Sequence, residues 1–409
     1  MSDLPRSLVT VGAGQAAVAA VRLLRRRGFD GRVTVLSDEL HAPYQRPPLS
    51  KEFLRGETEP EDLTLLDESW CADNDVELRL GVRAESVAAG VVRLVDGSEL
   101  ASDAILLATG VSARRLPGVG GDRVVYLRTL DDAARLRGML SAAERIAVVG
   151  GGLIGSEVAS AARDSGIAVT VLEAGALPLL SQLGPEMAGF YAGLHRQYGV
   201  DLRCGQEIGA VDETAGGVVV RTAAGDVEAD LVVVAVGAVP NDEVARVSGI
   251  PVDPVRGGIA VDDACRTAVP GVFAAGDVAS RAVGNGFVRV EHVDNATTQG
   301  SAVAKALIGK PAGPADEVPW FWSDQYEIGL QFVGRPRPGA EIVVRGSVDD
   351  RDFTAFYLAD GCVHAAFAVD RGGDVPAAKQ LIASGLPVSP VVLADDDTDL
   401  FDLLDTISA

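Results

Sequence analysis

The stretch Ser7–Glu39, SLVTVGAGQAAVAAVRLLRRRGFDGRVTVLSDE, is typical of a strand, a tight turn, a helix and a second strand. Its turn carries Gly12, Gly14 and Ala17 in the pattern G-x-G-x-x-A. In this pattern the first glycine allows the tight turn, the second lets the backbone approach a pyrophosphate, and the third small residue lets the helix pack closely on the strand. Free N–H groups at the start of the helix attract phosphate. The stretch therefore predicts a dinucleotide-binding βαβ unit.

A second copy of this unit is the stretch Arg145–Gly175, RIAVVGGGLIGSEVASAARDSGIAVTVLEAG, in which Gly150, Gly152 and Gly155 form G-x-G-x-x-G. One such glycine pattern is a weak signal. Two copies, each inside a complete strand–helix–strand pattern with an acidic residue about 20 or more positions on, are a strong one. The duplication predicts an α/β chain with two Rossmann-like dinucleotide-binding domains.

Glu173 directly follows the strand Val169–Leu172 of the second copy. A carboxylate at this place accepts hydrogen bonds from the adenosine ribose hydroxyls and repels a 2′-phosphate, and no arginine follows to hold one. The second site is therefore predicted to prefer NADH over NADPH. The alternative is a solvated carboxylate at a strand end, which the surrounding motif disfavours.

Each unit ends on a further apolar strand that runs into glycine, at Thr109-Gly110 in the first copy and at Gly237 in the second. Later in the chain, TAVPGVFAAGD brings Gly276 and Asp277 to the end of another apolar strand. Asp277 is either an ordinary turn residue or a carboxylate that binds a ribityl hydroxyl. The duplicated units favour the second interpretation.

Composition excludes several other functions. The net charge of −22 disfavours nucleic acid as a partner, because phosphate binding needs a basic surface, and solubility explains this charge best. The N-terminus lacks a secretory pattern, and no apolar run is long enough to span a bilayer, so a cytoplasmic protein is expected. The four cysteines and four histidines form no metal-ligand spacing, so we expect buried free thiols and no bound metal.

These motifs, together with RPPLSK at 46–51, VRVEHVDNATTQG at 288–300 and PWFWSDQYEIGLQFVG at 319–334, resemble the putidaredoxin reductase-like family of FAD- and NADH-dependent ferredoxin reductases. The resemblance extends over nearly the whole chain. It implies FAD at the first unit, NAD at the second and a C-terminal α+β domain. The implied FAD domain is discontinuous, 1–115 and 246–320, with the NAD domain inserted at 116–245 and the C-terminal domain at 321–409.

The resemblance also implies the residues that hold the cofactors. The FAD contacts carried over with the motifs are Ala16, Asp38, Arg46, Lys51, Ala84, Thr109, Arg128, Asp277, Val293 and Trp322. Further predicted cofactor contacts are Gly12, Gly14, Gly110, Gly276 and Glu291. The NAD contacts are Gly150, Gly152, Ile154, Gly155, Glu157, Glu173 and Gly237. Two positions depart from the pattern. Ser37 stands where more distant relatives have the ribose-binding acid, so Asp38 or Glu39 must reach the ribose instead. Ala84 has a small side chain and can contribute only main-chain contacts.

Lys51 and Glu157 are the predicted catalytic residues. By resemblance Lys51 lies beside flavin N5, and Glu157, two residues past Gly155, is expected in the first turn of its helix. A buried lysine needs an opposite charge, and Glu157 is the candidate partner. Such a pair can orient the nicotinamide and stabilise the anionic reduced flavin. The alternative is a surface lysine and an unrelated acid near a helix N-terminus.

No cysteine lies between Gly12 and Cys71, so the thiolate that a flavin-dependent disulfide reductase or a single-cysteine peroxidase needs is absent there. The reduced flavin is therefore expected to transfer its electrons one at a time, from an exposed edge that lies beside Trp322. The expected acceptor is a [2Fe–2S] ferredoxin that serves a cytochrome P450 or a Rieske oxygenase. The enzyme is expected to be a monomer or weak dimer. The candidate cations for docking the ferredoxin are Arg281, Lys305, Lys310, Arg335 and Arg337.

Two other interpretations stay open on the sequence. One is a flavoenzyme that delivers electrons elsewhere, as an NADH oxidase or a rubredoxin reductase does. The other is a non-enzymatic, redox-sensing flavoprotein related to apoptosis-inducing factor. That class usually carries targeting or nucleic-acid-binding segments, and none is visible here.

Overall fold

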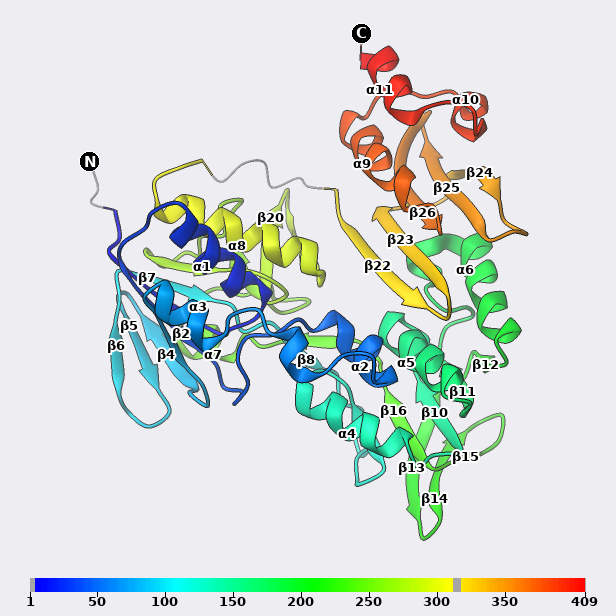
Figure 1. Ribbon diagram of the computed structural model, residues 1–409, viewed down its shortest axis with the longest axis horizontal. Helices are drawn as coiled ribbons and strands as arrows, with labels where there is room; N and C mark the ends of the chain where they lie inside the picture. Colours follow the sequence, from blue (N-terminus) through cyan, green and yellow to red (C-terminus); the bar gives the residue numbers. More distant parts are fainter. Residues whose placement is uncertain (1–3, 312–317, 409) are drawn as a thin grey trace. The chain divides into compact units, whose positions relative to one another are not determined.

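A computed structural model describes residues 4–311 and 318–408. The described residues form two compact units, each drawn from separate parts of the chain (Figure 1). The first unit contains 4–45, 60–112 and 238–311, and the second contains 46–59, 113–237 and 318–408. The four-segment domain division expected from the sequence stays a prediction, and its residues 1–3, 312–317 and 409 lie outside the described residues.

The first unit is built on a five-stranded parallel sheet in the order β19-β7-β1-β2-β3. The strands are β1 Ser7–Val11, β2 Arg32–Leu36, β3 Val76–Arg79, β7 Ala104–Leu107 and β19 Val272–Ala274. The helix α1, Gln15–Arg26, connects β1 to β2 as the glycine motif predicted. Side chains alternate between the two faces of each strand, so each face of this sheet has its own apolar core.

Helices cover one face of this sheet. Figure 1 shows α1 beside α8, Val293–Leu307, and both helices contribute to the same apolar cluster as Leu8 and Val33 of the sheet. Two small three-stranded sheets contribute to the core on the other face: β4-β5-β6 is antiparallel, and β18-β20-β21 is mixed, with β18 parallel to β20. Their strands are β4 Ala84–Ala88, β5 Val91–Leu94, β6 Glu99–Ala101, β18 Ile259–Val261, β20 Ala279–Val283 and β21 Gly286–Val288. The remaining elements are η2 Pro60–Leu63, α3 Glu68–Asp73 and α7 Glu243–Val247, and the short strands β8 Val111–Ala113 and β17 Ala238–Pro240 pair with each other.

The second unit repeats this plan. Its parallel sheet has the order β12-β11-β10-β16-β9, formed by β9 Val124–Tyr126, β10 Arg145–Val149, β11 Ala168–Glu173, β12 Asp201–Cys204 and β16 Leu231–Val234. Helices α4 Leu130–Leu140 and α5 Leu153–Asp164 pack on one face, together with the short η1 Pro47–Ser50 and α2 Glu52–Arg55. The antiparallel strands β13 Ile208–Thr214, β14 Gly217–Thr222 and β15 Val227–Ala229 cover the other.

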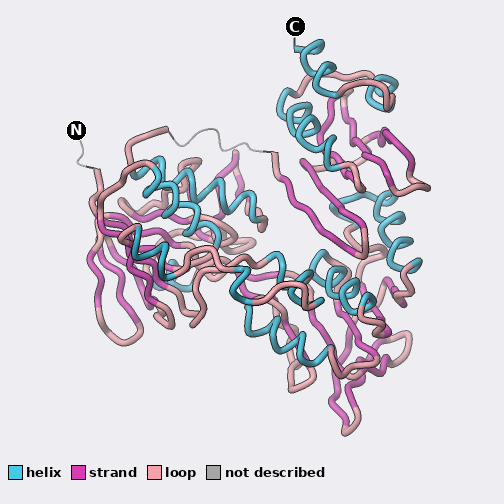
Figure 2. The backbone as a smooth tube through the Cα atoms, in the orientation of Figure 1, coloured by secondary structure: helices cyan, strands magenta, loops and turns pink. Residues whose placement is uncertain are grey.

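The last part of the second unit is a five-stranded antiparallel sheet, visible in Figure 2 as a run of strands before the final helices. Its order is β22-β23-β26-β25-β24, formed by β22 Trp320–Gln325, β23 Ile328–Gly334, β24 Glu341–Ser347, β25 Asp352–Ala359 and β26 Cys362–Val369. One face packs on α6, Leu180–Gln197, which is kinked at Gly184 and Pro185. The other face is covered by α9 Val375–Ser384, α10 Pro390–Ala394 and α11 Leu400–Ser408, and η3 Gly372–Asp374 precedes α9.

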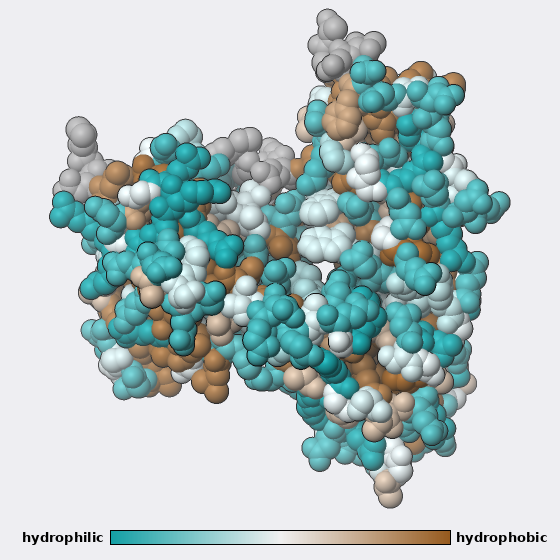
Figure 3. All heavy atoms as spheres, in the orientation of Figure 1, coloured by the Kyte–Doolittle hydropathy of each residue, from teal (hydrophilic) through white to brown (hydrophobic). Residues whose placement is uncertain are grey.

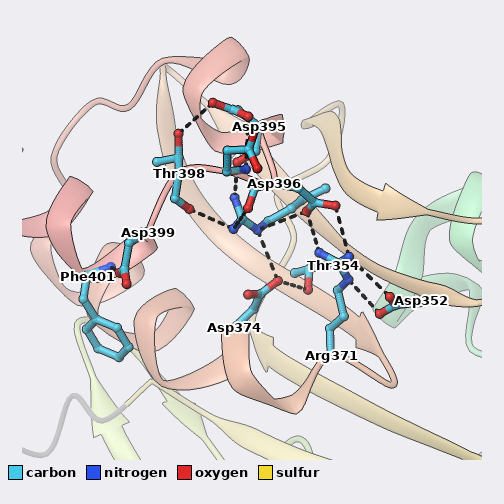
Figure 4. Close-up of polar contacts among 11 residues, drawn as sticks. Asp352, Thr354, Arg371, Asp374, Asp395, Asp396, Thr398, Asp399 and Phe401 are labelled. Atoms are coloured by element: carbon cyan, nitrogen blue, oxygen red, sulfur yellow. Dashed lines mark hydrogen bonds and ion pairs between the residues drawn. The ribbon is translucent and has the colours of Figure 1, made fainter.

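Two arginines tie the loop between α10 and α11 to the C-terminal sheet, and Figure 4 shows one of them, Arg371, together with Asp396 of this loop. Arg345 on β24 is 7% exposed and donates to the carbonyl oxygens of Asp395, Asp396 and Thr398 at 2.5, 3.2 and 2.8 Å. Arg371 holds the carboxylate of Asp396 at 2.6 Å from the other side. The acidic run of this loop is therefore held by two arginines rather than left free in solvent.

The predicted fold class is confirmed: two Rossmann-like parallel-sheet parts and a C-terminal α+β part are present. On the face drawn in Figure 3, hydrophilic residues predominate and apolar residues are interspersed among them. Among the described residues, no helix combines the length and the apolarity that a bilayer crossing demands.

Candidate functional site

The glycine turn of the first unit has the geometry of a phosphate cradle. Gly12 has φ +103°, and a Cβ added to it would collide with the carbonyl oxygen of Ala108, so only glycine fits. A Cβ added to Gly14, the N-cap of α1, would meet no atom within 4 Å. Backbone N–H groups at a helix start therefore border open space, which is what a pyrophosphate requires.

Gly276 lies close to this turn. A Cβ at Gly276 would come within 3.1 Å of the Cβ of Ala16, and the Gly276 N–H donates to Gln299 Oε1 on α8 at 2.8 Å. The structure thus brings together Gly12, Ala16 and the turn that carries Asp277, as expected for one ligand site. Gln299 was not anticipated; it lies in the VRVEHVDNATTQG motif, which was recognised without a role for this residue.

The acids after β2 differ in their surroundings. Asp38 is exposed, whereas Glu39 is half-buried and accepts a 2.6 Å hydrogen bond from the Tyr44 hydroxyl. Ser37 is buried and its hydroxyl accepts from the Glu39 N–H. Both acids lie at the carboxyl end of the sheet, where ribose is bound in such folds, and the choice of Asp38 stays a prediction.

Thr109 is fixed by a partner that the sequence did not indicate. Its hydroxyl donates to the Asn241 carbonyl at 2.7 Å, and the Asn241 side chain donates back to the Thr109 carbonyl at 2.8 Å. Ala84, by contrast, is buried in the apolar core beneath the sheet. Any contact that Ala84 makes with a cofactor is therefore a main-chain contact, as expected from its small side chain.

The second glycine turn repeats the first. Gly150 has φ +100°, and a Cβ there would collide with the carbonyl oxygen of Ala235. A Cβ on Gly155 would collide with the Gly150 carbonyl, whereas one on Gly152 would meet nothing within 4 Å. Ile154 between them is 43% exposed at the start of α5. This turn fits a second dinucleotide, and the two turns together suit FAD and NAD.

Glu173 ends β11 beside this turn, and the backbone orients its carboxylate. Its two oxygens accept the N–H groups of Gly151 and Gly175 at 2.7 and 2.6 Å. A pocket of 430 Å³ begins at the next residue, Ala174, and includes Gly205 and Gln206. Carboxylate oxygens have further lone pairs, so Glu173 can still accept ribose hydroxyls. Its role with NADH stays a prediction.

Lys51 and Glu157 form a buried ion pair within the second unit. Lys51 Nζ lies 2.8 Å from Glu157 Oε1, and the two side chains are 6% and 3% exposed. Lys51 follows η1, in which Pro47 and Pro48 form the first turn. One expectation was wrong: α5 begins at Leu153 after the N-cap Gly152, so Glu157 is its fifth residue and lies in the second turn. From there it points into the packed interior instead of capping the helix.

Hydroxyl groups complete the surroundings of Glu157. Ser50 donates to Oε2, and Ser323 on β22 donates to Oε1 at 2.6 Å. Behind Ser323, the Gln325 amide nitrogen donates to Ser323 Oγ at 2.9 Å and to Tyr191 Oη at 2.6 Å. The sequence interpretation missed these roles. The available signal was WFWSDQ, where alternation places two polar residues, Ser323 and Gln325, on the buried face of a strand.

An imidazole is buried next to this network. His195 on α6 is 2% exposed, and its Nδ1 lies 2.7 Å from the Tyr326 hydroxyl. Burial lowers the pKa of His195 from 6.5 to about 4, so it is neutral at physiological pH. Burial likewise raises the pKa of Tyr191 and Tyr326 well above the usual value for tyrosine. His195, Tyr191 and Tyr326 are therefore uncharged at neutral pH and lie next to the hydrogen-bond network of the ion pair.

The predicted cofactor contacts divide between the two units. Those in the first unit are Gly12, Gly14, Ala16, Asp38, Ala84, Thr109, Gly110, Gly276, Asp277, Glu291 and Val293. Those in the second are Arg46, Lys51, Arg128, Gly150, Gly152, Ile154, Gly155, Glu157, Glu173, Gly237 and Trp322. Within the second unit, Arg46 donates to the Arg128 carbonyl at 2.9 Å, and the Trp322 ring stacks on Trp320 at 5.2 Å.

The cations proposed for docking also divide. Arg281, Lys305 and Lys310 belong to the first unit, and Arg335 and Arg337 to the second. Arg281 pairs with Asp263 at 2.8 Å and Arg337 with Asp360 at 3.3 Å, so acids partly neutralise two of the five charges. Their use as one patch stays a prediction.

All four cysteines are free, but only Cys71 and Cys265 are buried as expected. Cys204 and Cys362 are half-buried, because each lies at the end of an outer strand or beside a turn. Within 4–311 and 318–408, no group of three or more metal-binding side chains comes together.

A family model described as pyridine nucleotide-disulphide oxidoreductase matches residues 6–300, more than half of the chain. The chain belongs to this family. A second model, described as reductase C-terminal, matches residues 320–404, the region of the antiparallel sheet and its helices. Despite the family's description, no cysteine that could exchange with a disulfide lies between Gly12 and Cys71.

Individual relatives match over nearly the full length. Rhodocoxin reductase of Rhodococcus erythropolis is 39% identical over 405 residues, which cover 96% of this chain and 93% of that protein. The ferredoxin–NAD(+) reductase component of the anthranilate 1,2-dioxygenase system of Burkholderia cepacia is 41% identical over 402 residues, 96% of this chain and 98% of that one. The chain is also similar to the crystal structure of the covalent putidaredoxin reductase–putidaredoxin complex, with a TM-score of 0.93, 35% identity and 100% of both chains covered. The putidaredoxin reductase-like family expected from the motifs is confirmed.

Proposed function

We propose that this chain is an NADH-dependent ferredoxin reductase that binds FAD in the first unit and NADH in the second. One relative is named as the ferredoxin–NAD(+) reductase component of a dioxygenase system, and a similar solved structure is named as putidaredoxin reductase in a covalent complex with putidaredoxin. The observation that carries the proposal is the buried Lys51–Glu157 pair beside a dinucleotide turn, in a chain without a cysteine in the segment where flavin-dependent disulfide reductases have one.

Each part of this arrangement has a physical task. The turn at 150–155 presents backbone N–H groups to the phosphates of NADH, and Glu173 excludes a 2′-phosphate by charge. Glu157 fixes the Lys51 ammonium inside a dry environment, where a charge acts more strongly than in water. Bound FAD supplies the conversion of a two-electron donor into single-electron transfers. The residues of this chain bind the FAD, orient it and exclude water from its surroundings.

The electron acceptor is proposed to be a [2Fe–2S] ferredoxin that serves a cytochrome P450 or a Rieske oxygenase. Monomer or weak dimer formation and a cytoplasmic location are proposed as well, and sizing chromatography tests the first of them. Which ferredoxin is used depends on surface complementarity that the net charge of −22 alone does not decide.

Stopped-flow mixing separates the two half-reactions. In the first, the FAD-loaded protein is mixed with NADH in the absence of oxygen, and the absorbance of the oxidised flavin is expected to disappear during the stopped-flow recording. In the second, the reduced protein is mixed with a [2Fe–2S] ferredoxin, with rubredoxin or with oxygen. Fast reoxidation by ferredoxin supports the proposal. Fast reoxidation by oxygen or rubredoxin but not by ferredoxin would replace it with one of the alternatives.

A further inference from the structure

The Glu157 carboxylate is bound by three side chains from two separate parts of the second unit, residues 50–51 and Ser323. Lys51 Nζ and the Ser323 hydroxyl share Oε1, at 2.8 and 2.6 Å, and the Ser50 hydroxyl donates to Oε2. Ser50 and Ser323 are 2% and 0% exposed, so water does not compete for these bonds. Hydrogen bonds to a charged acceptor are among the strongest in proteins, and here they also define the orientation of the carboxylate plane.

The bond to Ser323 fixes the direction of the next one. Because the Ser323 proton points to Glu157, its oxygen must accept from Gln325, and the amide nitrogen lies 2.9 Å away. The same nitrogen donates to Tyr191 Oη at 2.6 Å. Reversing the amide would set two oxygens against each other at Ser323, so the network determines the amide orientation.

This orientation leaves one polar atom without compensation. Gln325 Oε1 is buried and has no hydrogen-bond partner in the parts of the chain that the structure describes. An unsatisfied buried acceptor is destabilising, and an apolar residue of similar shape would avoid it. The fold thus retains a glutamine whose two amide protons are used and whose oxygen is not. A requirement for the donors explains this choice.

The two partners of the ion pair are held unequally. Besides Lys51, Glu157 has two hydroxyl donors, Ser50 and Ser323. Lys51, in the described chain, has only Glu157 at 2.8 Å and a long contact to the Pro47 carbonyl at 3.5 Å. An ammonium has three protons, so Lys51 keeps donor capacity for another group, and its direction depends on Glu157.

We infer that Ser323 and Gln325, supported by Tyr191, are positioning residues of the reductase: they hold Glu157, and through it aim the Lys51 ammonium. This inference rests on the proposed function and deepens it. The first strand of the C-terminal sheet therefore belongs to the machinery that accepts electrons from NADH.

The Lys51 ammonium offers a direct readout that does not depend on turnover. The chain has four lysines, Lys51, Lys305, Lys310 and Lys379, so ammonium signals in ¹⁵N-lysine NMR are few, and loss of one signal in Lys51→Met assigns it. A buried, fixed ammonium exchanges its protons slowly with water. In Ser323→Ala and Gln325→Leu of the FAD-loaded protein, the Lys51 signal is expected to broaden or disappear while the other three stay.

Flavin reduction by NADH gives the second readout. Its limiting rate is expected to fall about tenfold in Ser323→Ala, the effect of losing one hydrogen bond to a charged group. A fall of the same kind is expected in Gln325→Leu, because Ser323 then loses the donor that orients it. The matched control is Tyr357→Phe. Tyr357 is also buried against α6 and donates to the Leu183 carbonyl at 2.7 Å, in the same apolar cluster as Tyr191, but it does not contact the network. Tyr191→Phe should have a smaller effect of the same kind, and Tyr357→Phe none.

The inference is overturned when Ser323→Ala leaves both the Lys51 signal and the reduction rate unchanged, or when Tyr357→Phe alters them equally. Should Gln325→Leu not fold, Ser323→Ala decides alone, because it removes a single oxygen atom. Failure of the proposed function has a different signature: the unaltered protein would not pass electrons from NADH to ferredoxin, whereas the Lys51 signal would still respond to Ser323→Ala.

Discussion

The Lys51 ammonium lies 2.8 Å from the Glu157 carboxylate, with both side chains shielded from solvent. The two residues come from motifs about 100 positions apart in sequence (roughly the length of a domain), and the fold brings η1 and α5 together to join them. A buried pair of this kind contributes little net stability compared with apolar packing, so its retention is best explained by a chemical role.

Lys51→Met and Glu157→Ala are each expected to slow reduction of the flavin by NADH by at least about tenfold. The double variant should be little slower than either single variant, because each removes the same interaction. Single-turnover rates measure this effect, and circular dichroism checks that the fold is intact. Additive losses would show that the residues act separately, and unchanged rates would make the pair purely structural.

Glu173 is expected to set the preference for NADH. The ratio of kcat/KM for NADH over NADPH should be about 100-fold or more, since placing like charges together is unfavourable by several kcal/mol. In Glu173→Gln combined with Ala174→Arg this ratio should fall and approach one. The glutamine is chosen because it keeps an oxygen for the Gly151 or Gly175 N–H.

The control for this prediction is Ala174→Arg alone, at a position that is exposed in the structure. It should leave the preference largely in place, because the Glu173 carboxylate remains. Equal efficiency with the two nucleotides in the unaltered protein would contradict the assignment of Glu173.

His195 is expected to make the protein less stable in mild acid. Its pKa is 6.5 in an unfolded chain and about 4 in the fold, because burial disfavours the cation. Between these values the unfolded state binds the extra proton, so stability is unaffected above pH 6.5 and decreases as the pH falls toward 4. At pH 5 the loss is about 2 kcal/mol.

Urea unfolding at pH 7.5 and pH 5 measures this effect. In His195→Asn, which cannot titrate but can still reach the Tyr326 hydroxyl, the difference between the two pH values should shrink by that amount. A difference of equal size in both proteins would mean that other groups cause the acid sensitivity.

Arg345→Met is expected to destabilise the protein by about 3–5 kcal/mol, because three carbonyl oxygens of the loop lose the buried guanidinium that donates to them. The comparison is Arg337→Met, which removes an exposed pair with Asp360 and should change stability by less than about 1 kcal/mol. Thermal unfolding of both variants tests the contrast. Similar midpoints for the two variants would show that Arg345 is replaceable and that the loop 395–399 is held by its other contacts.

Local patterns account for what could be predicted from the sequence. The two glycine turns require positive φ at Gly12 and Gly150, so their motifs indicate both the turn and the ligand. The C-terminal α+β domain was expected from the resemblance to the family, and the structure contains it, with the strands β25 and β26 and the helix α9.

Contacts between distant segments could not be predicted in the same way. Ser323 contacts Glu157 only because β22 packs beside α5, and Tyr191 reaches Gln325 only because α6 packs on the C-terminal sheet. No local pattern encodes that packing. The position of Glu157 was misjudged by one turn because the helix start depends on the N-cap geometry of Gly152. Whether a cysteine or an arginine is buried likewise depends on the tertiary fold.

The central claim is that electrons from NADH leave this protein through a [2Fe–2S] ferredoxin. The most direct test measures NADH-driven reduction of purified [2Fe–2S] ferredoxins through cytochrome c, beside NADH consumption with oxygen alone, over a range of salt concentrations. The account predicts a kcat/KM for at least one ferredoxin that is about 100-fold or more above the oxygen reaction, and a salt dependence that reveals whether charge governs docking. Efficient turnover with oxygen or quinone and none with any ferredoxin would contradict it.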